Sequence, residues 1–300
     1  MKILILGSKG QLGSELQRQL NTTESSLGKI PKEYIAADVL AIDIDTVDIS
    51  NREQISEYIS KNRFDIIFNC AAYTDVDACE TNVELAYKVN AFAPGYIAEA
   101  AKGVGSRLIH ISTDYVFRGS DPIPRNEKDE TAPVTVYGKS KLDGENAVIN
   151  AGADAIIVRT AWLYGLVGRN FVKTIMKIAR EKGVLKVVND QIGNPTSATD
   201  LAYHLLRLAV TEYTGIFHCT NNGICSWYEF ACEIVKEAQI NAEVTPCTTK
   251  EFPREAPRPG YSALDNMRLR QTLGDDMRLW NQAIKEYIYE LKEAEGGLYE

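Results

Sequence analysis

The feature that most constrains this chain is the regular alternation, over its first 160 residues, of short apolar runs with longer amphipathic segments. Short apolar runs bounded by glycine or polar residues predict buried strands, and apolar residues at helical spacing predict amphipathic helices. Alternating strands and helices favour a parallel sheet with helices on its faces. The predicted strands are residues 3–6, 39–42, 66–69, 108–112 and 156–160.

Amphipathic segments between these strands are predicted to be helices, at residues 11–20, 52–61, 83–104 and 137–149. Pro94 interrupts the third of them. A proline inside a helix removes a backbone hydrogen bond and clashes with the preceding turn. We therefore expect either a bend near Phe92 or two separate helices.

The pattern is less regular after residue 160. Helices are predicted at residues 171–181, 198–210, 227–238 and around 287–289, with a short strand at 186–188 and an apolar run at 215–219. We expect an α/β fold in which residues 1–160 form a doubly wound parallel sheet, completed by about residues 215–220. Residues 161–300 are expected to form mainly a smaller, partly interleaved α/β lobe.

The charge of the chain and its N-terminal residues exclude several classes of partner. A net charge of −8 repels nucleic acid and anionic membranes. No apolar stretch approaches the ~18 residues that span a bilayer. Residues 3–6 lead straight into glycine without a small-residue cleavage site, which favours a first strand over a signal peptide. We therefore expect a cytoplasmic protein with no nucleic-acid or membrane partner.

A glycine-rich segment, Gly-Ser-Lys-Gly-Gln-Leu-Gly at residues 7–13, follows the first predicted strand and begins the first predicted helix. Glycines here allow a tight turn and let backbone N–H groups approach a pyrophosphate, which the helix dipole also favours. A glycine-rich turn without a ligand is the alternative. The position directly after an apolar N-terminal strand favours dinucleotide binding, with contacts from Gly7, Gly10, Gln11, Leu12 and Gly13.

Acidic residues after the second predicted strand indicate which dinucleotide is bound. Asp43 ends that strand, where a carboxylate can accept the ribose hydroxyls and repel a 2'-phosphate, which favours NADH. Asp48 and Ile49 suit an adenine contact. Lys9, in the glycine segment, can reach a 2'-phosphate and makes dual use of NADPH plausible. The alternative is that these carboxylates form only a solvated cluster.

Polar residues in two segments have the character of a catalytic group. Thr113 and Asp114 directly follow an apolar run, so they are expected at the carboxyl edge of the sheet, where parallel sheets bind ligands. Tyr137 and Lys141 are four residues apart and so lie on one helix face. A nearby ammonium favours the phenolate, so we expect Lys141 to lower the pKa of Tyr137 and to help it move a proton. An amphipathic helix surface is the alternative for this pair.

These motifs occur together in one superfamily. The motifs are the segment 7–13, Asn-Cys-Ala-Ala-Tyr-Thr at 69–74, Val-Asn at 89–90, Ser-Thr-Asp-Tyr-Val-Phe at 112–117 and Tyr-Gly-Lys-Ser-Lys at 137–141. With this set the chain resembles the extended short-chain dehydrogenases/reductases, which have a Rossmann-type fold. Further segments, at 71–77, 159–165, 168–171, 189–196 and 258–259, resemble the dTDP-4-dehydrorhamnose reductases in particular. The resemblance covers essentially the whole chain.

The resemblance implies that NAD(P)H reduces the C4 keto group of dTDP-4-dehydro-β-L-rhamnose to dTDP-β-L-rhamnose. It implies that Tyr137 donates the proton and that Lys141 holds the nicotinamide ribose. Thr113 would polarise the carbonyl, and Asp114 and Tyr115 would orient the sugar.

The resemblance also assigns residues outside the catalytic group. Further cofactor contacts would be Ala71, Ala72, Tyr73 and Asn90. In the second, substrate-binding lobe, the contacts to the nucleotide sugar would be Trp162, Asn170 and Arg258. A core aromatic residue, a helix cap and a surface charge are the respective alternatives for these three.

No metal site is assigned from the sequence. The six cysteines form no Cys-x-x-Cys pair and are expected to be free thiols, and the three histidines are scattered. Some of the similar enzymes place a Mg²⁺ ligand at the position of Glu15, but a lone glutamate here is expected to be an exposed helix residue. Arg169 departs from the family pattern, where asparagine is common. The metal, a homodimer, and the exact nucleotide and sugar of the substrate are left open.

Two other functions fit the same fold. One is a nucleotide-binding regulatory subunit that does no chemistry, and the presence of both Tyr137 and Lys141 argues against it. The other is a nucleotide-sugar epimerase or dehydratase. A dehydratase typically needs a glutamate after the aspartate, and Tyr115 stands there instead.

Overall fold

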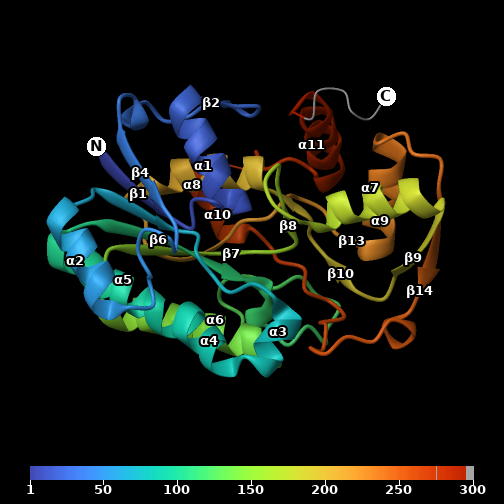
Figure 1. The fold of residues 1–300 in the computed structure, drawn as a ribbon, viewed down its shortest axis with the longest axis horizontal. Coiled ribbons are helices and arrows are strands. Elements are labelled where there is room, and N and C mark those ends of the chain that lie inside the picture. The colour runs from blue at the N-terminus through green and yellow to red at the C-terminus, as the bar shows by residue number, and fades with distance from the viewer. Residues whose placement is uncertain (275, 295–300) are drawn as a thin grey trace.

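The computed structural model of the chain describes residues 1–274 and 276–294 and shows a Rossmann-type α/β fold (Figure 1). Its centre is a six-stranded parallel sheet with the order β12-β7-β6-β5-β1-β4. The strands are β1 (Lys2–Leu6), β4 (Asp38–Ile42), β5 (Ile66–Asn69), β6 (Arg107–Thr113), β7 (Ala155–Thr160) and β12 (Gly215–His218). The expected fold class is confirmed.

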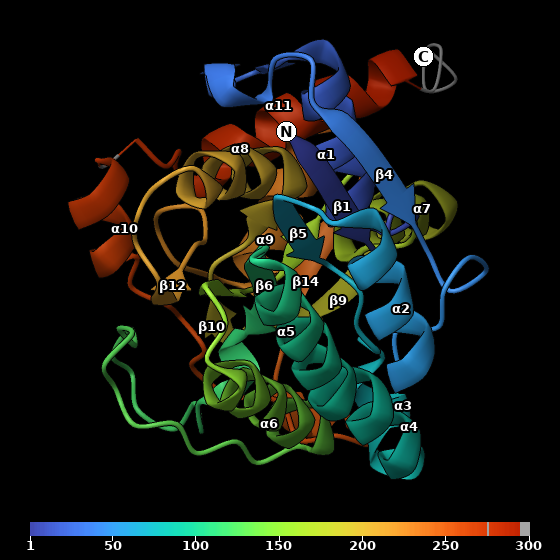
Figure 2. The ribbon, with the colours of Figure 1, turned by 90° about the vertical axis from the view of Figure 1, so that its left-hand side faces the viewer.

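Helices cover both faces of this sheet (Figure 2). Successive side chains of a strand point to opposite faces, so Ile3 and Ile5 belong to one apolar core while Leu4 and Leu6 belong to the other. The first core is closed by α1 (Gln11–Thr22), α8 (Ala198–Ala209) and α10 (Met267–Leu273). The second is closed by α2 (Arg52–Asn62), α5 (Ala93–Val104) and α6 (Val136–Ala151).

The helix predicted at residues 83–104 is broken as expected. The chain forms α4 (Val83–Tyr87), then a π-helical turn at Lys88–Phe92, then α5. Pro94 is the second residue of α5 and directly follows this π-helical turn, through which the backbone stays helical. A short preceding helix, α3 (Val76–Thr81), was not predicted.

A second lobe lies beside the sheet, on the right in Figure 1. Its apolar core includes residues of α7 (Phe171–Lys182), α9 (Trp227–Glu237), α11 (Trp280–Ala294) and β9 (Val184–Val188). β9 pairs in parallel with β14 (Glu243–Cys247). Two-residue ladders join β8 (Leu163–Tyr164) to β11 (Thr196–Ser197), and β10 (Ile192–Gly193) to β13 (Cys225–Ser226). A small hairpin, β2 (Glu24–Ser25) with β3 (Gly28–Lys29), follows α1. The predicted end of this lobe, residues 295–300, lies outside the described residues.

The strand order reverses direction between β1 and β5. From β1 the chain runs outward to β4, then returns past β1 to β5 on its other side. Open parallel sheets bind ligands beyond the carboxyl ends of strands at such a reversal. In the described part of the chain, no helix is long and apolar enough to cross a membrane.

Candidate active site

Two cavities meet at the carboxyl ends of β1 and β5. The first has a volume of about 450 Å³ and the second about 490 Å³. Both are lined by Gly7, Gly10, Cys70 and Ala72, so they adjoin at the glycine loop. The first extends over the end of β4, and the second extends over the ends of β6 and β7 toward the second lobe.

The glycine loop between β1 and α1 brings backbone segments closer together than side chains would allow. Gly7 has φ +79°, and a Cβ there would lie 2.8 Å from the Ala71 nitrogen. A Cβ on Gly13 would lie 2.2 Å from the Gly7 oxygen, so the helix packs against the loop without room for a side chain. Gly10 caps α1 without a side-chain acceptor, which leaves the first N–H groups of the helix open. This geometry fits a dinucleotide pyrophosphate.

The first cavity contains most of the predicted adenosine contacts. Asp43 accepts hydrogen bonds from the N–H groups of Lys9 and Ile44, at 3.0 and 2.9 Å. The Lys9 ammonium pairs with Asp45 at 2.7 Å. Asp48 accepts from the Ser50 hydroxyl, which holds the pKa of its carboxyl below the usual value. The predicted residues in the lining are Gly7, Gly10, Asp43, Asp48, Ile49, Ala71, Ala72 and Tyr73.

Asn90, predicted to touch the cofactor, does not line either cavity. It is fully buried, and its side chain brackets Tyr73 by accepting from the Tyr73 N–H at 2.8 Å and donating to its carbonyl at 2.9 Å. It also donates to the Ser140 hydroxyl at 3.3 Å. Asn90 therefore fixes the loop after β5 against α6.

The second cavity brings the predicted catalytic residues together. Its lining includes Thr113, Asp114, Tyr115, Tyr137 and Lys141, with Gln11, Leu12 and Gly13 from the glycine loop. Thr113 ends β6 and the next two directly follow it, while Tyr137 and Lys141 lie one turn apart on α6. A Cβ on Gly138 would lie 2.3 Å from the Tyr115 oxygen, so glycine allows the two segments to touch. The rings of Tyr115 and Tyr137 meet edge to face at 5.4 Å.

The electrostatics of Tyr137 and Lys141 differ from the sequence expectation. Burial raises the pKa of Tyr137, while the neighbouring Thr113 hydroxyl opposes that rise. Burial lowers the pKa of Lys141 to about 8, and its Nζ donates to the Ile111 carbonyl at 2.6 Å. The expectation that Lys141 lowers the pKa of Tyr137 is therefore wrong for this geometry, because desolvation of the phenol dominates.

Asp114 is a second perturbed group in the cavity. Burial raises the pKa of its carboxyl to about 6, against the opposing effect of hydrogen bonds from Ser262 and Thr113. The Thr113 hydroxyl donates to Asp114 Oδ1 at 2.9 Å. A shifted carboxyl in a cavity with a tyrosine and a lysine is typical of a catalytic site.

Trp162 lines the second cavity with both faces of its indole covered. It stacks on Trp227 with ring centroids 3.5 Å apart and planes 7° apart. A Cβ on Gly193 would lie 2.6–2.8 Å from three bonded indole atoms of Trp162, and the middle one of the three would be nearest. Such a point lies above the ring and not at its edge, so Gly193 packs on the indole face. Trp162 also has φ +47°, a backbone conformation that non-glycine residues rarely adopt. Trp162 therefore presents an edge to the cavity.

Sequence reasoning missed Trp227, which also lines the second cavity. It is the first residue of α9, directly after Ser226, which forms a capping box with Glu229. That capping pattern is visible in the sequence and marks a helix start. Nothing in the sequence indicates that this helix start faces Trp162.

Asn170 and Arg258, predicted at the substrate, are not among the residues that line either cavity. Asn170 caps α7 and donates to the Gly165 carbonyl at 2.8 Å and to Gln11 at 3.1 Å. Its amide thus serves as the helix cap and joins the second lobe to the glycine loop. Arg258 pairs with Asp77 at 2.8 Å.

Glu15 is buried and not exposed as expected. It accepts hydrogen bonds from Arg18 at 2.9 and 2.6 Å and from Gln19 at 2.8 Å. Its carboxylate is therefore satisfied by side chains of its own helix. Within residues 1–274 and 276–294, no group of three or more histidine, cysteine, aspartate or glutamate side chains is arranged to hold a metal ion.

Comparison with known proteins agrees with this site. The RmlD substrate binding domain family matches residues 1–293. The spore coat polysaccharide biosynthesis protein SpsK of Bacillus subtilis is 38% identical over 293 residues, which cover 98% of this chain and 99% of that protein.

Two solved structures are similar over nearly their whole length. A dTDP-4-dehydrorhamnose reductase from Clostridium acetobutylicum is 46% identical, with a TM-score of 0.91 over 97% of this chain and 100% of that one. A dTDP-4-dehydrorhamnose reductase from Bacillus anthracis, in complex with NADP, is 38% identical, with a TM-score of 0.90 over 96% of this chain and 99% of that one. This chain therefore belongs to the RmlD substrate binding domain family, together with the dTDP-4-dehydrorhamnose reductases.

Proposed function

We propose that this chain reduces the C4 keto group of dTDP-4-dehydro-β-L-rhamnose to dTDP-β-L-rhamnose, with NADH or NADPH as cofactor and Tyr137 as proton donor. The observation that carries the proposal is that Thr113, Asp114, Tyr137 and Lys141 line one cavity, which is continuous with the glycine loop. Relatives matched over nearly their full length are named for this activity, which supports it.

The side chains of the second cavity suit the proton transfer. Bound NAD(P)H would supply a hydride to the ketone carbon, which leaves negative charge on the ketone oxygen. Tyr137 is a neutral phenol at neutral pH, because burial raises its pKa, so its hydroxyl carries the proton that this oxygen needs. Thr113 is proposed to turn its hydroxyl from Asp114 to the same oxygen. Lys141 is proposed to hold the nicotinamide ribose through hydrogen bonds from its charged ammonium.

Asp43 is proposed to favour NADH, and Lys9 to keep NADPH usable. The Asp43 carboxylate lines the first cavity, where it can accept from ribose hydroxyls and repel a 2'-phosphate. The pair of Lys9 with Asp45 is exposed on both sides, and exposed pairs contribute little stability. Lys9 can therefore leave Asp45 for a 2'-phosphate at small cost.

The substrate side of the proposal rests on Tyr115, Trp162 and Trp227, which line the second cavity together with the glycine loop. Arg258 is proposed to reach the diphosphate with the N–H groups that Asp77 and the Ala256 carbonyl do not take. Asn170 is proposed to act indirectly, by holding α7 against Gln11 of the glycine loop.

An assay of the purified chain with dTDP-4-dehydro-β-L-rhamnose and each of NADH and NADPH tests the proposal. We expect oxidation of the added cofactor and formation of dTDP-β-L-rhamnose. Absence of turnover by a folded protein that still binds NADH would contradict the proposal and favour a regulatory subunit. A tightly held cofactor that copurifies and is not consumed would instead indicate an epimerase or a dehydratase.

A further inference from the structure

A buried ion pair lies directly behind the catalytic residues. Arg159 donates two hydrogen bonds to Glu145, at 2.8 and 2.6 Å, and the Ser112 hydroxyl donates to Glu145 at 2.5 Å. The side chains of the ion pair are 3% and 1% exposed. These three residues are called the buried triad below. No role in the proposed reaction has so far been assigned to them.

The buried triad connects β6 and α6, which carry proposed catalytic residues, to the neighbouring strand β7. Ser112 precedes Thr113 on β6, and it lies opposite Arg159 of β7 in the sheet register. Glu145 is one helical turn beyond Lys141 on α6, and Lys141 is one turn beyond Tyr137. A shift of Glu145 would therefore move α6 relative to both strand ends.

The ion pair is not explained by stability alone. Bringing two charges into a protein interior costs free energy that their attraction only partly offsets, and a well-packed apolar pair of similar volume is often as stable. Arg159 also has one nitrogen, Nη1, without a hydrogen-bond partner among the described residues. Its guanidinium lies over the Phe117 ring at 5.1 Å. A charged pair in this place therefore suggests that one of its charges acts on a neighbouring group.

The charged and titratable groups around Lys141 indicate that this neighbouring group is Lys141. Cys70, beyond β5, acts on the Lys141 charge, but burial raises the pKa of the thiol to about 12 and keeps it neutral. Burial, with a smaller contribution from Lys141, lowers the pKa of His110 on β6, so the imidazole is neutral as well. Glu145 is the carboxylate that acts on Lys141, and it opposes the lowering of the Lys141 pKa by burial. Facing Tyr137 are Asp114, Tyr115 and Cys79, all of which raise the pKa of the phenol.

We propose that Glu145 is a positioning residue that keeps Lys141 positively charged, and that Arg159 and Ser112 hold Glu145 in place for this purpose. The inference rests on the proposed function, since it assigns Lys141 a charged role in the reduction. This role of Glu145 can be distinguished from a purely structural role. Removal of the Glu145 charge changes the protonation of Lys141 as well as the stability of the fold.

The experiment compares Glu145→Gln with a matched control, Asp200→Asn, which removes a buried carboxylate from a partly exposed arginine, Arg278, away from the cavities. The main readout is the titration of Lys141 in protein labelled with ¹³C at lysine Cε, without cofactor or substrate, with the Lys141 signal assigned from Lys141→Arg. We expect Glu145→Gln to lower the midpoint by roughly one pH unit or more, since a nearby opposite charge raises a lysine pKa. Asp200→Asn is expected to leave it unchanged.

A second readout is the pH dependence of turnover. We expect Glu145→Gln to move the alkaline limb of kcat to lower pH, while KM for the nucleotide sugar changes less than kcat. An unchanged Lys141 midpoint in Glu145→Gln, or equal shifts in Glu145→Gln and Asp200→Asn, would overturn the inference. A shifted midpoint in a chain without reductase activity would refute the proposed function and leave the charge relation standing.

Glu145→Gln leaves Arg159 buried without a counter-charge, so a second variant guards against failure to fold. Glu145→Gln/Arg159→Gln removes both charges of the pair. We expect this double variant to fold better than Glu145→Gln and to show the same lowered Lys141 midpoint. A wild-type midpoint in the double variant contradicts the inference.

Discussion

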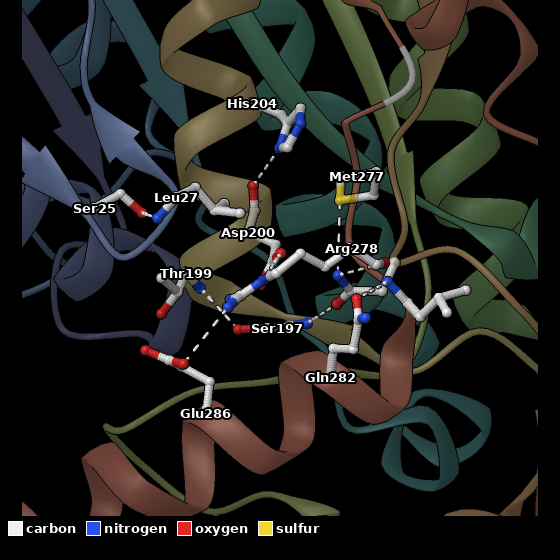
Figure 3. A network of polar contacts seen from close by, with 12 residues as sticks. Ser25, Leu27, Ser197, Thr199, Asp200, His204, Met277, Arg278, Gln282 and Glu286 are labelled. Atoms are coloured by element: carbon white, nitrogen blue, oxygen red, sulfur yellow. Dashed lines mark hydrogen bonds and ion pairs between the residues drawn. The ribbon is translucent and has the colours of Figure 1, made fainter.

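Two arginine pairs with a buried carboxylate have nearly the same geometry in this molecule and different surroundings. Arg159 binds Glu145 at 2.8 and 2.6 Å, and Arg278 binds Asp200 at 2.8 and 2.7 Å. The first pair joins β7 to α6, and its Glu145 also binds Ser112 of β6, next to the proposed catalytic residue Thr113. The second joins α8 to the segment that precedes α11, where Figure 3 shows Arg278 between Asp200 and Glu286.

The two arginines differ in what else they can reach. Arg278 is partly exposed, and its Nη1 lies 3.9 Å from Glu286 of α11, so water and a second carboxylate share its charge. Arg159 is almost fully buried, and Glu145 is its carboxylate partner. The comparison teaches that an arginine–carboxylate pair can have two roles. The Arg278–Asp200 pair holds two segments together, whereas the Arg159–Glu145 pair is proposed to control the charge of Lys141.

Loss of stability is the largest effect expected from breaking either pair. We expect Glu145→Gln to lower the free energy of unfolding by about 3–5 kcal/mol, because Arg159 is left as an uncompensated buried charge. Asp200→Asn is expected to lower it by less, since Arg278 keeps Glu286 and contact with water. Denaturant unfolding at neutral pH measures both values. A larger loss in Asp200→Asn would reverse the comparison.

Asp114 sharpens the comparison, because this buried carboxyl forms no ion pair in the part of the chain that the structure describes. Burial raises its pKa from 3.8 to about 6, so between these values the folded chain holds a proton that the unfolded chain has lost. Its contribution therefore stabilises the fold less as pH rises through this window. We expect the stability of Asp114→Asn relative to wild type to increase by up to about 3 kcal/mol from pH 4 to pH 7. Denaturant titrations across this range measure it, and a flat difference would contradict the shifted pKa.

The sequence predicted the parts of the fold that local patterns encode. The five predicted strands and the broken helix near Phe92 are present, because buried strands are apolar throughout and proline has a fixed backbone geometry. The two-residue ladders of β8, β10, β11 and β13 were not predicted, since two residues carry no periodicity. The five-residue strand β14 was also not predicted, and local sequence does not show that it pairs with β9, some 60 positions earlier.

The residues of the candidate site also fall into those that local sequence patterns predicted and those that depend on tertiary contacts. The glycine loop, Thr113 and the pair Tyr137 and Lys141 were found because each directly follows a strand or shares a helix face. The positions of Asn90 and Asn170 could not be foreseen, since their partners Tyr73 and Gln11 come from distant segments. Trp227 and Glu145 were missed for the same reason, because tertiary contacts alone bring them to Trp162 and Arg159.

An aromatic pair offers a second comparison of the site with the lobe behind it. Trp227 stacks on Trp162 in the cavity, whereas Trp280 packs on Phe230 in the core of the second lobe. We expect Trp227→Leu to raise KM for the nucleotide sugar by about tenfold, since stacking that holds Trp162 contributes on the order of 1 kcal/mol. Trp280→Leu is the control and is expected to lower stability with little change in KM. Steady-state kinetics measure KM, and equal effects of both variants would remove Trp227 from the site.

The smallest expected effect concerns the cofactor. Asp43→Asn removes the charge that repels a 2'-phosphate, so the ratio of kcat/KM for NADPH to that for NADH should rise, by roughly fivefold or less for a partly exposed charge. Asp45→Asn, which frees Lys9, is expected to shift the ratio in the same direction. Initial rates with both cofactors measure it. An unchanged ratio in Asp43→Asn would mean that this carboxylate does not face the ribose.

The most direct test of the whole account is the turnover of Tyr137→Phe. The variant keeps the ring that packs against Tyr115 and removes only the hydroxyl that holds the proton. In single-turnover measurements with dTDP-4-dehydro-β-L-rhamnose, where chemistry limits the rate, we expect a loss of about 10²-fold or more with nearly unchanged NADH affinity. A rate close to that of the wild-type chain would show that the proton comes from another group, and would contradict the proposed mechanism.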